Sequence, residues 1–153
     1  VSATTSAALV NQDVIIAPGK AYSIFAIDSL SKIKAVAVED NFTVPSSDSV
    51  RIRFLHFSTN APAVDVLNGT SVLFSNRSFN DQQTNTSLAE FITIAAGTYN
   101  FAVNLAATST SVLSLPNTVL QGGKVYTFYA KGFAGGLGTQ ALGLGTIIHN
   151  EGN

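Results

Sequence analysis

Short stretches in which apolar and polar residues alternate recur along this chain, about every 8 to 12 residues. The clearest example is the stretch from Thr98 to Leu105. Its large side chains fall on one face of an extended strand: Tyr99, Phe101, Val103 and Leu105. No window places apolar residues at the i, i+3, i+4 and i+7 spacing of an amphipathic helix. The pattern therefore predicts an all-β fold, an antiparallel immunoglobulin-like β-sandwich.

The same alternation predicts where the strands lie. We expect them over residues 8–16, 21–28, 33–38, 50–57, 63–67, 71–75, 88–94, 98–106, 111–115, 125–131 and 140–148. Asn68-Gly69 predicts a tight hairpin turn, and the polar run from Asn76 to Thr86 is expected to be a surface loop. The inward faces predict a core made of Val50, Ile52, Phe54, Val64, Val66, Tyr99, Phe101, Val103, Leu113, Tyr126 and Phe128.

An internal repeat organises these strands. Shifting the sequence by 104 residues lays Ala3–Ala26 on Ala107–Ala130 with seven identities in 24 positions. Gly19 and Gly123 coincide, so we expect both to occupy equivalent turns with positive φ. With a small gap, residues 34–38 fall on 140–144. We therefore interpret residues 1–44 as the C-terminal half of a first sandwich repeat, 45–49 as a linker and 50–153 as a complete repeat.

Four segments carry a resemblance to a known family: RFLHFSTNAPAVDVLNGT, AAGTYNFAV, GGKVYTFYAKG and QALGLGTIIHN. Together they resemble the bacterial domain of unknown function 4397 family, and Asn60 to Val66 is the most specific part of the match. The resemblance implies secreted or cell-surface immunoglobulin-like sandwich modules, often found in tandem. It implies no established reaction and no agreed binding residues.

A half module poses a physical problem, because its few inward side chains do not offset the backbone entropy lost on folding. Three arrangements would solve it. A separate upstream half is bound as a second piece, residues 1–44 lie on the complete module as extra strands, or they complete a neighbouring molecule by strand addition. The expected partner is therefore another copy of the chain or a missing half module, joined by β-strand pairing.

Candidate catalytic and metal-binding groups are few. His56 and Asp65 flank a turn that contains Ser58 and Asn60, but spacing alone supplies no oxyanion hole, so we expect structural roles for them. The two histidines and the scattered carboxylates predict no metal site. The glycine-rich run at residues 132–138 lacks a Gly-Lys-Ser/Thr sequence and is expected to be a flexible hairpin loop. No cofactor and no enzymatic activity are predicted.

Three residues are the candidate contacts for a ligand or partner: Tyr129, Lys131 and Phe133. An exposed aromatic near the glycine-rich loop would suit a sugar ring or a protein surface. The alternative, which we prefer, is that Tyr129 packs under the half module.

Two functional classes stay open. We expect a non-catalytic extracellular or cell-surface module with a structural or assembly role, such as a subunit of a fibre or surface protein. The alternative is a glycan- or protein-binding accessory module of a secreted hydrolase or adhesin. A net charge of −1 without a basic block argues against nucleic acid, and no apolar run of about 18 residues predicts membrane insertion. The start at Val1 predicts that an N-terminal segment has been removed.

Overall fold

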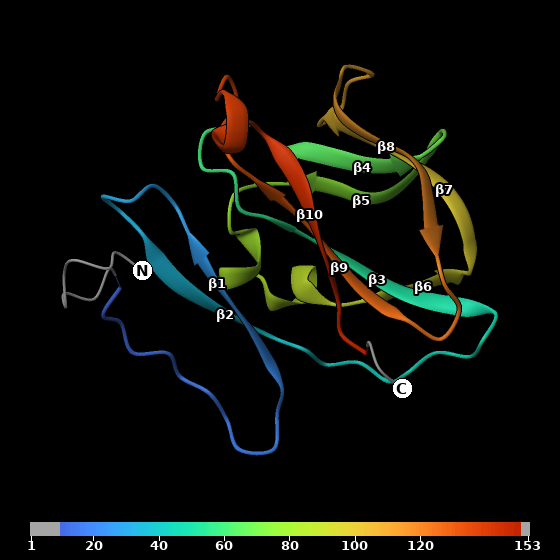
Figure 1. Ribbon diagram of the computed structural model, residues 1–153, viewed down its shortest axis with the longest axis horizontal. Helices are drawn as coiled ribbons and strands as arrows, with labels where there is room; N and C mark the ends of the chain where they lie inside the picture. The colour runs from blue at the N-terminus through green and yellow to red at the C-terminus, as the bar shows by residue number, and fades with distance from the viewer. Residues whose placement is uncertain (1–9, 151–153) are drawn as a thin grey trace. The chain divides into compact units, whose positions relative to one another are not determined.

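The computed structural model describes residues 10–150 of the chain. It contains two compact units, which we call unit 1 (Val1–Asn41) and unit 2 (Phe42–Asn153). Between residues 10 and 150 the regular structure is made of β-strands and three short 3₁₀ helices (Figure 1). The predicted all-β sandwich fold is confirmed.

In its described residues, 10–41, unit 1 forms a single hairpin. Strands β1 (Tyr22–Ile27) and β2 (Lys34–Glu39) pair antiparallel, with Tyr22 opposite Glu39. The strand predicted over residues 8–16 was wrong in its described part, because residues 10–16 form no strand. Residues 8 and 9 lie outside the described residues. A strand exists only where another strand pairs with it, and alternation in sequence does not supply that partner.

Unit 2 is a sandwich of two four-stranded sheets (Figure 1). The first has the order β10 (Gly143–Ile148), β9 (Val125–Lys131), β3 (Ser49–His56), β6 (Ile92–Ala95). The second has the order β5 (Ser71–Arg77), β4 (Val64–Asn68), β7 (Gly97–Leu105), β8 (Ser111–Leu120). Neighbouring strands pair antiparallel except β3 and β9, which pair in parallel.

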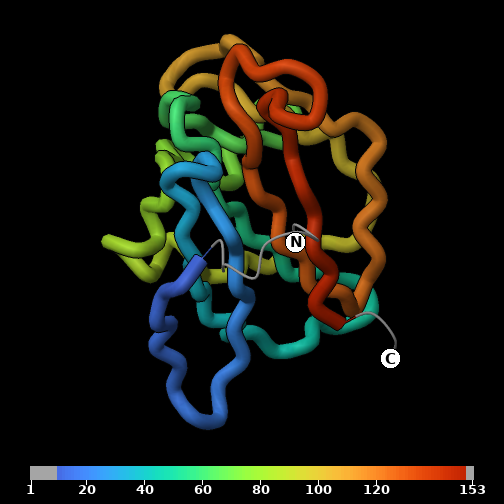
Figure 2. The backbone as a smooth tube through the Cα atoms, turned by 60° about the vertical axis from the view of Figure 1, so that its left-hand side comes forward, coloured from blue at the N-terminus to red at the C-terminus, as the bar shows by residue number. Residues whose placement is uncertain are grey.

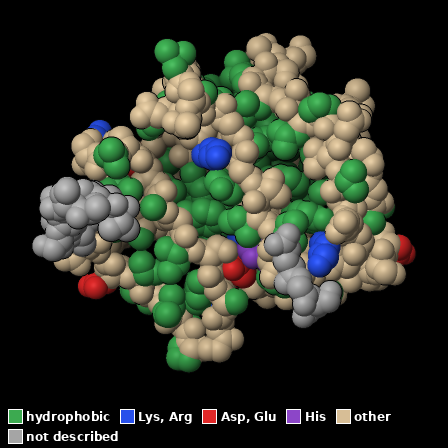
Figure 3. Space-filling view, in the orientation of Figure 1, with side chains coloured by type: hydrophobic (Ala, Val, Ile, Leu, Met, Phe, Trp, Pro, Cys, Tyr) green, Lys and Arg blue, Asp and Glu red, His purple; other side chains and the backbone are tan. Residues whose placement is uncertain are grey.

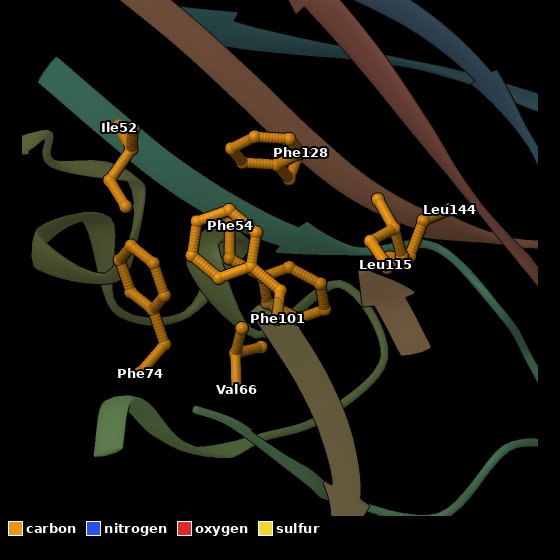
Figure 4. A pocket seen from close by; sticks show the side chains of 8 residues that line it. All are labelled: Ile52, Phe54, Val66, Phe74, Phe101, Leu115, Phe128 and Leu144. Atoms are coloured by element: carbon orange, nitrogen blue, oxygen red, sulfur yellow. The ribbon is translucent and has the colours of Figure 1, made fainter. Parts of the chain in front are cut away.

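The hydrophobic core lies between these two sheets. Nine of the predicted core residues are buried in it, and Tyr99 and Leu113 are partly buried against it. The two sheets meet at aromatic contacts such as Phe101 with Phe128, whose ring centroids are 5.4 Å apart. Figure 4 shows side chains from both sheets around an apolar gap of about 10 Å³, which has room for roughly one water molecule and not for a ligand.

Strand β3 is buried on both faces, although its alternation fits a strand with one covered face. Val50, Ile52 and Phe54 point into the core, while Arg53 and Leu55 on the opposite face are also 0% exposed. Within unit 2, the ring of Phe91 lies 4.5 Å from the Arg53 guanidinium carbon. Aromatic and cationic groups thus cover part of the outer face.

Several predicted boundaries moved because short helices take up residues expected in strands. The 3₁₀ helix η2 (Thr86–Ala89) replaces the start of the strand expected at 88, and the Asn85 side chain accepts a hydrogen bond from the Ser87 amide at its N-terminus. The helix η3 (Gly138–Gln140) likewise precedes β10. The tight turn at Asn68-Gly69 is confirmed, since Asn68 pairs with Ser71 across it.

The polar run from Asn76 to Thr86 is only partly the surface loop that we expected. It begins within β5 and contains the helix η1 (Asp81–Gln83). Arg77 and Gln82 are each only 2% exposed. Arg77 donates to Asp81 and to the Phe54 carbonyl, and the Gln82 Nε2 donates to the Asn80 Oδ1 at 2.7 Å; composition does not reveal such bonds.

The geometry of the two hairpins bears on the internal repeat. Gly19 and Gly123 have φ of 77° and 79°, so the predicted equivalent turns are confirmed. The alignment of the second strand was wrong by three residues. Lys34 opposes Ile27 while Gly143 opposes Lys131, so residues 34–39 correspond to 143–148. The longer connection of residues 132–142 accounts for the difference.

We predict that Gly123→Ala destabilises unit 2 by about 1–2 kcal/mol, because a Cβ is strained at this positive φ. The nearest atom to such a Cβ is the Pro45 carbonyl oxygen at 3.9 Å, so strain and not crowding sets the cost. Gly143→Ala is the control, since its backbone is not left-handed and its surroundings are open. Urea unfolding checks both, and equal stability of the two variants would contradict the prediction.

Candidate functional site

The predicted contact residues lie at one end of β9. Tyr129 and Lys131 share a face of that strand, and Phe133 follows in the glycine-rich loop. Tyr129 is half-buried: its ring lies 6.3 Å from that of Phe57 and covers Gly145, where a Cβ would overlap it. Lys131 is exposed. Tyr129 therefore has a packing role whether or not it also binds a partner.

The glycine-rich loop joins β9 to β10, as predicted, and it is tied to the turn after β3. The Asn60 side chain donates to the Ala134 carbonyl oxygen at 3.0 Å and accepts from the Ala134 amide at 2.8 Å. Phe133 donates its amide to the Gln140 carbonyl at 2.9 Å. Asn60 thus acts as a brace between two loops.

Asp65, one of the two candidate catalytic groups that flank the turn after β3, bonds to backbone amides. The Asp65 carboxylate accepts from the backbone amides of Asn76, at 2.7 Å, and Ala107, at 2.9 Å. Both donors have positive φ, and these bonds hold the pKa of Asp65 below its usual value. Asp65 therefore braces β4 against its neighbours, which fits the structural role we expected.

His56 is fully buried at the end of β3. Its Nε2 lies 3.3 Å from the Pro62 carbonyl oxygen, and within residues 10–150 its Nδ1 has no hydrogen-bond partner. Ser58 is also 0% exposed, and its Oγ has no partner in the same described part. Burial lowers the pKa of His56 from 6.5, which favours the neutral ring.

A buried ion pair that sequence reasoning missed joins β5 to the core. Arg77 donates to both Asp81 carboxylate oxygens, at 2.9 and 2.8 Å, and to the Phe54 carbonyl oxygen at 2.7 Å. The spacing i, i+4 was the only sequence signal. With its donors engaged and the pair buried, Arg77 has a structural role.

A second polar group lies on the outer face of the first sheet. The Arg53 Nε donates to the Thr127 Oγ1 at 2.8 Å, and the same Oγ1 lies 2.6 Å from the His149 Nε2. The ring of Phe91 packs edge-on against that of His149 at 5.7 Å. This group links β3 and β9 to Phe91, which precedes β6, and to His149, which follows β10.

A groove of about 270 Å³ lies beside β5, η2 and the start of β6 in unit 2. It is lined by Leu73, Phe74, Ser75, Arg77, Ser87, Leu88, Glu90, Phe91 and Ile92. Between residues 10 and 150, no three His, Asp or Glu side chains gather closely enough to hold a metal ion. In that same part of the chain, no helix is long and apolar enough to cross a bilayer.

The hairpins β1–β2 and β9–β10, which Figure 2 traces in blue and in orange to red, share two kinds of hydrogen bond. The Tyr22 hydroxyl accepts from the Ala17 amide at 3.2 Å, and the Tyr126 hydroxyl accepts from the Gln121 amide at 2.9 Å. Asp40 donates to Ala21 at 2.8 Å, as His149 does to Val125 at 2.9 Å. Each of these bonds in unit 1 has its counterpart in unit 2.

Corresponding side chains of the two hairpins differ sharply in exposure. Phe128 is 6% exposed in the core of unit 2, whereas its counterpart Ile24 is 62% exposed. Leu120 is 2% exposed, whereas its counterpart Ile16 is 60% exposed. We call the surface formed by Ile16, Tyr22, Ile24 and Ala26 the open face of unit 1. It is the candidate functional site, because large exposed apolar side chains in one place mark interaction surfaces.

Residues 1–67 match the model of a protein family described as a domain of unknown function, DUF4397. This part of the chain belongs to the DUF4397 family. The match includes Asn60 to Val66, the segment on which the resemblance chiefly rests, and it spans β1 to β4. The chain matches no curated protein.

We predict that the stability of this chain falls as the pH drops below about 6.5, with His56 as one cause. The pKa of His56 is lowered in the folded state, so the unfolded chain binds the proton first and gains from it. The contribution is complete above pH 6.5 and is lost as the pH falls towards the folded pKa.

Urea unfolding between pH 7.5 and about 5 tests this, with NMR titration of the His56 ring as the direct readout. His56→Gln should flatten the pH dependence. A His56 ring that titrates at or above 6.5 in the folded chain would contradict the prediction.

Proposed function

We propose that this DUF4397 chain is a non-catalytic structural module of the cell exterior, which assembles with another polypeptide by β-strand addition. The observation that carries the proposal is the two-stranded hairpin of unit 1, which buries Ile27, Val36 and Val38 on one face and leaves Ile24 on the other face 62% exposed. In the described residues, β1 has β2 as its one strand neighbour. A two-stranded hairpin is at best marginally stable in water, so a third strand would stabilise it.

The two edges of this hairpin are not equivalent. On the β2 side, the Gln12 side chain donates to the Ala35 carbonyl oxygen at 3.1 Å and accepts from the Ala35 amide at 3.2 Å. A side chain thus occupies the backbone groups at which an added strand would pair. This blocked edge favours addition at β1.

The structural hydrogen bonds of Asp65, Arg77 and His56 support a non-catalytic role. Asp65 and Arg77 are each bound to backbone or to an ion-pair partner, and His56 is buried beside a carbonyl oxygen. On the face shown in Figure 3, hydrophobic side chains are widespread and charged ones are scattered. Such a surface suits contact with protein more than with a highly charged ligand.

Native mass spectrometry of the purified protein, read beside its denatured mass, tests this function. We expect particles that hold more than one polypeptide: either copies of this 15.9 kDa chain or one copy with a second piece. A lone 15.9 kDa particle at every concentration would contradict assembly. It would favour ligand binding at Tyr129, Lys131 and Phe133 in its place.

A further inference from the structure

We propose that the open face of unit 1 binds the N-terminal half of another DUF4397 sandwich, whose first strand adds to β1 in parallel. This proposal rests on the assembly function above and specifies its partner and register. The partner strand is the equivalent of β3, and the rest of that half covers Ile24 and Ile16. Unit 2 provides the template, because there the equivalent hairpin is covered in this way.

In unit 2, β9 lies between β10 and β3. The parallel ladder begins with the Arg51 amide donating to the Lys124 carbonyl at 3.1 Å and ends with the Phe57 amide donating to Ala130 at 2.9 Å. The counterparts of the two acceptors in unit 1 are Lys20 and Ala26, which are the same residue types. Because the Ala21 carbonyl accepts from Asp40 on the β2 side, the alternate carbonyls of Lys20 and Ala26 face the opposite edge, where a parallel strand would pair.

The template also fixes the register. Phe54 on β3 lies beside Phe128 on β9, so the Phe54 equivalent of the partner would lie beside Ile24. Phe128 also packs against Phe101 of β7. The partner would thus bury the Ile24 side chain between two aromatic rings, which removes its apolar surface from water.

Residues 10–16 indicate that the partner supplies more than one strand to unit 1. Their counterparts, residues 114–120, form part of β8 by pairing with β7, with Leu120 opposite Gly97. In unit 1 the same stretch forms no strand, and Ile16 is exposed. A partner that pairs with both β1 and residues 10–16 must carry equivalents of β3 and β7. These two strands belong to the N-terminal half of a sandwich.

The sequence offers a matched pair of test positions at Ile15 and Ile16. Ile16 corresponds to buried Leu120, whereas Ile15 corresponds to Val119, which is 63% exposed in unit 2. An aspartate at 16 should therefore disturb the interface, and one at 15 should not. Both positions are more than half exposed in unit 1, so neither change should prevent folding.

The first experiment uses a labelled peptide of residues 49–57, SVRIRFLHF, added to the full chain. We expect saturable binding that Ile24→Asp weakens about tenfold or more, while Ile15→Asp and Ile24→Val leave it within about twofold. A peptide with Phe54→Asp should not bind. Failure of the wild-type peptide to bind a single-copy chain, or equal binding to Ile24→Asp, would overturn the proposal.

The second experiment compares native masses of the wild-type chain with Ile16→Asp, Ile24→Asp and Ile15→Asp. Where the wild type assembles, the first two variants should release single 15.9 kDa copies and the third should not. Assembly that survives both Ile16→Asp and Ile24→Asp would leave the assembly function standing but overturn this face as its site. If another copy of this chain supplies the strands, in place of a separate half sandwich, all native masses would be whole multiples of 15.9 kDa.

Discussion

The parallel pairing of β3 with β9 is the interaction on which the rest of unit 2 depends. It joins the first strand of the sandwich to a strand far along the chain, and it places Phe54 beside Phe128 in the middle of the core. The same strand receives Arg77, which donates to the Phe54 carbonyl oxygen. Sheet pairing, aromatic packing and the buried ion pair therefore meet on β3.

Within residues 10–41, unit 1 contains the hairpin that would receive such a strand, and β2 is the one strand paired with β1 there. The turn glycines have the same φ, and the tyrosine hydroxyls accept the same amide bond, so the backbone is prepared in the same way. The two hairpins differ in the burial of this face, since Ile24 is exposed and its counterpart Phe128 is buried. Because fully burying such a side chain stabilises a protein by about 1.5–3 kcal/mol, the open face favours a partner.

The sequence predicted local structure well wherever chemistry within a few residues decides it. Alternation gave β9 its observed bounds, and Asn68-Gly69 gave the hairpin turn. The sequence-based prediction failed where strand formation depends on a partner strand that is distant in sequence. Residues 10–16 align with residues 114–120 in the internal repeat, but only the latter pair with β7.

The candidate site shows the same division. Burial of Arg77 in a polar run depends on Asp81 and on a carbonyl of β3, which no local pattern reveals. Asp65 accepts from the amides of Asn76 and Ala107 on either side of β4, and both donors are distant from it in sequence. The exposure of Ile24 on the open face depends on whether a distant strand covers it, as one covers Phe128, and no local pattern gives that cover.

Amide hydrogen exchange of the chain in its single-copy form tests the central claim most directly. Ala21 and Val125 bond to the second strand of each hairpin, so the amides of Ile24 and Phe128 point to the opposite edge. We predict that the Phe128 amide exchanges about 100-fold or more slowly than that of Ile24, with the β2-paired Phe25 amide as an internal reference. Equal protection at Ile24 and Phe128 would mean that the β1 edge is already covered, and would contradict the account.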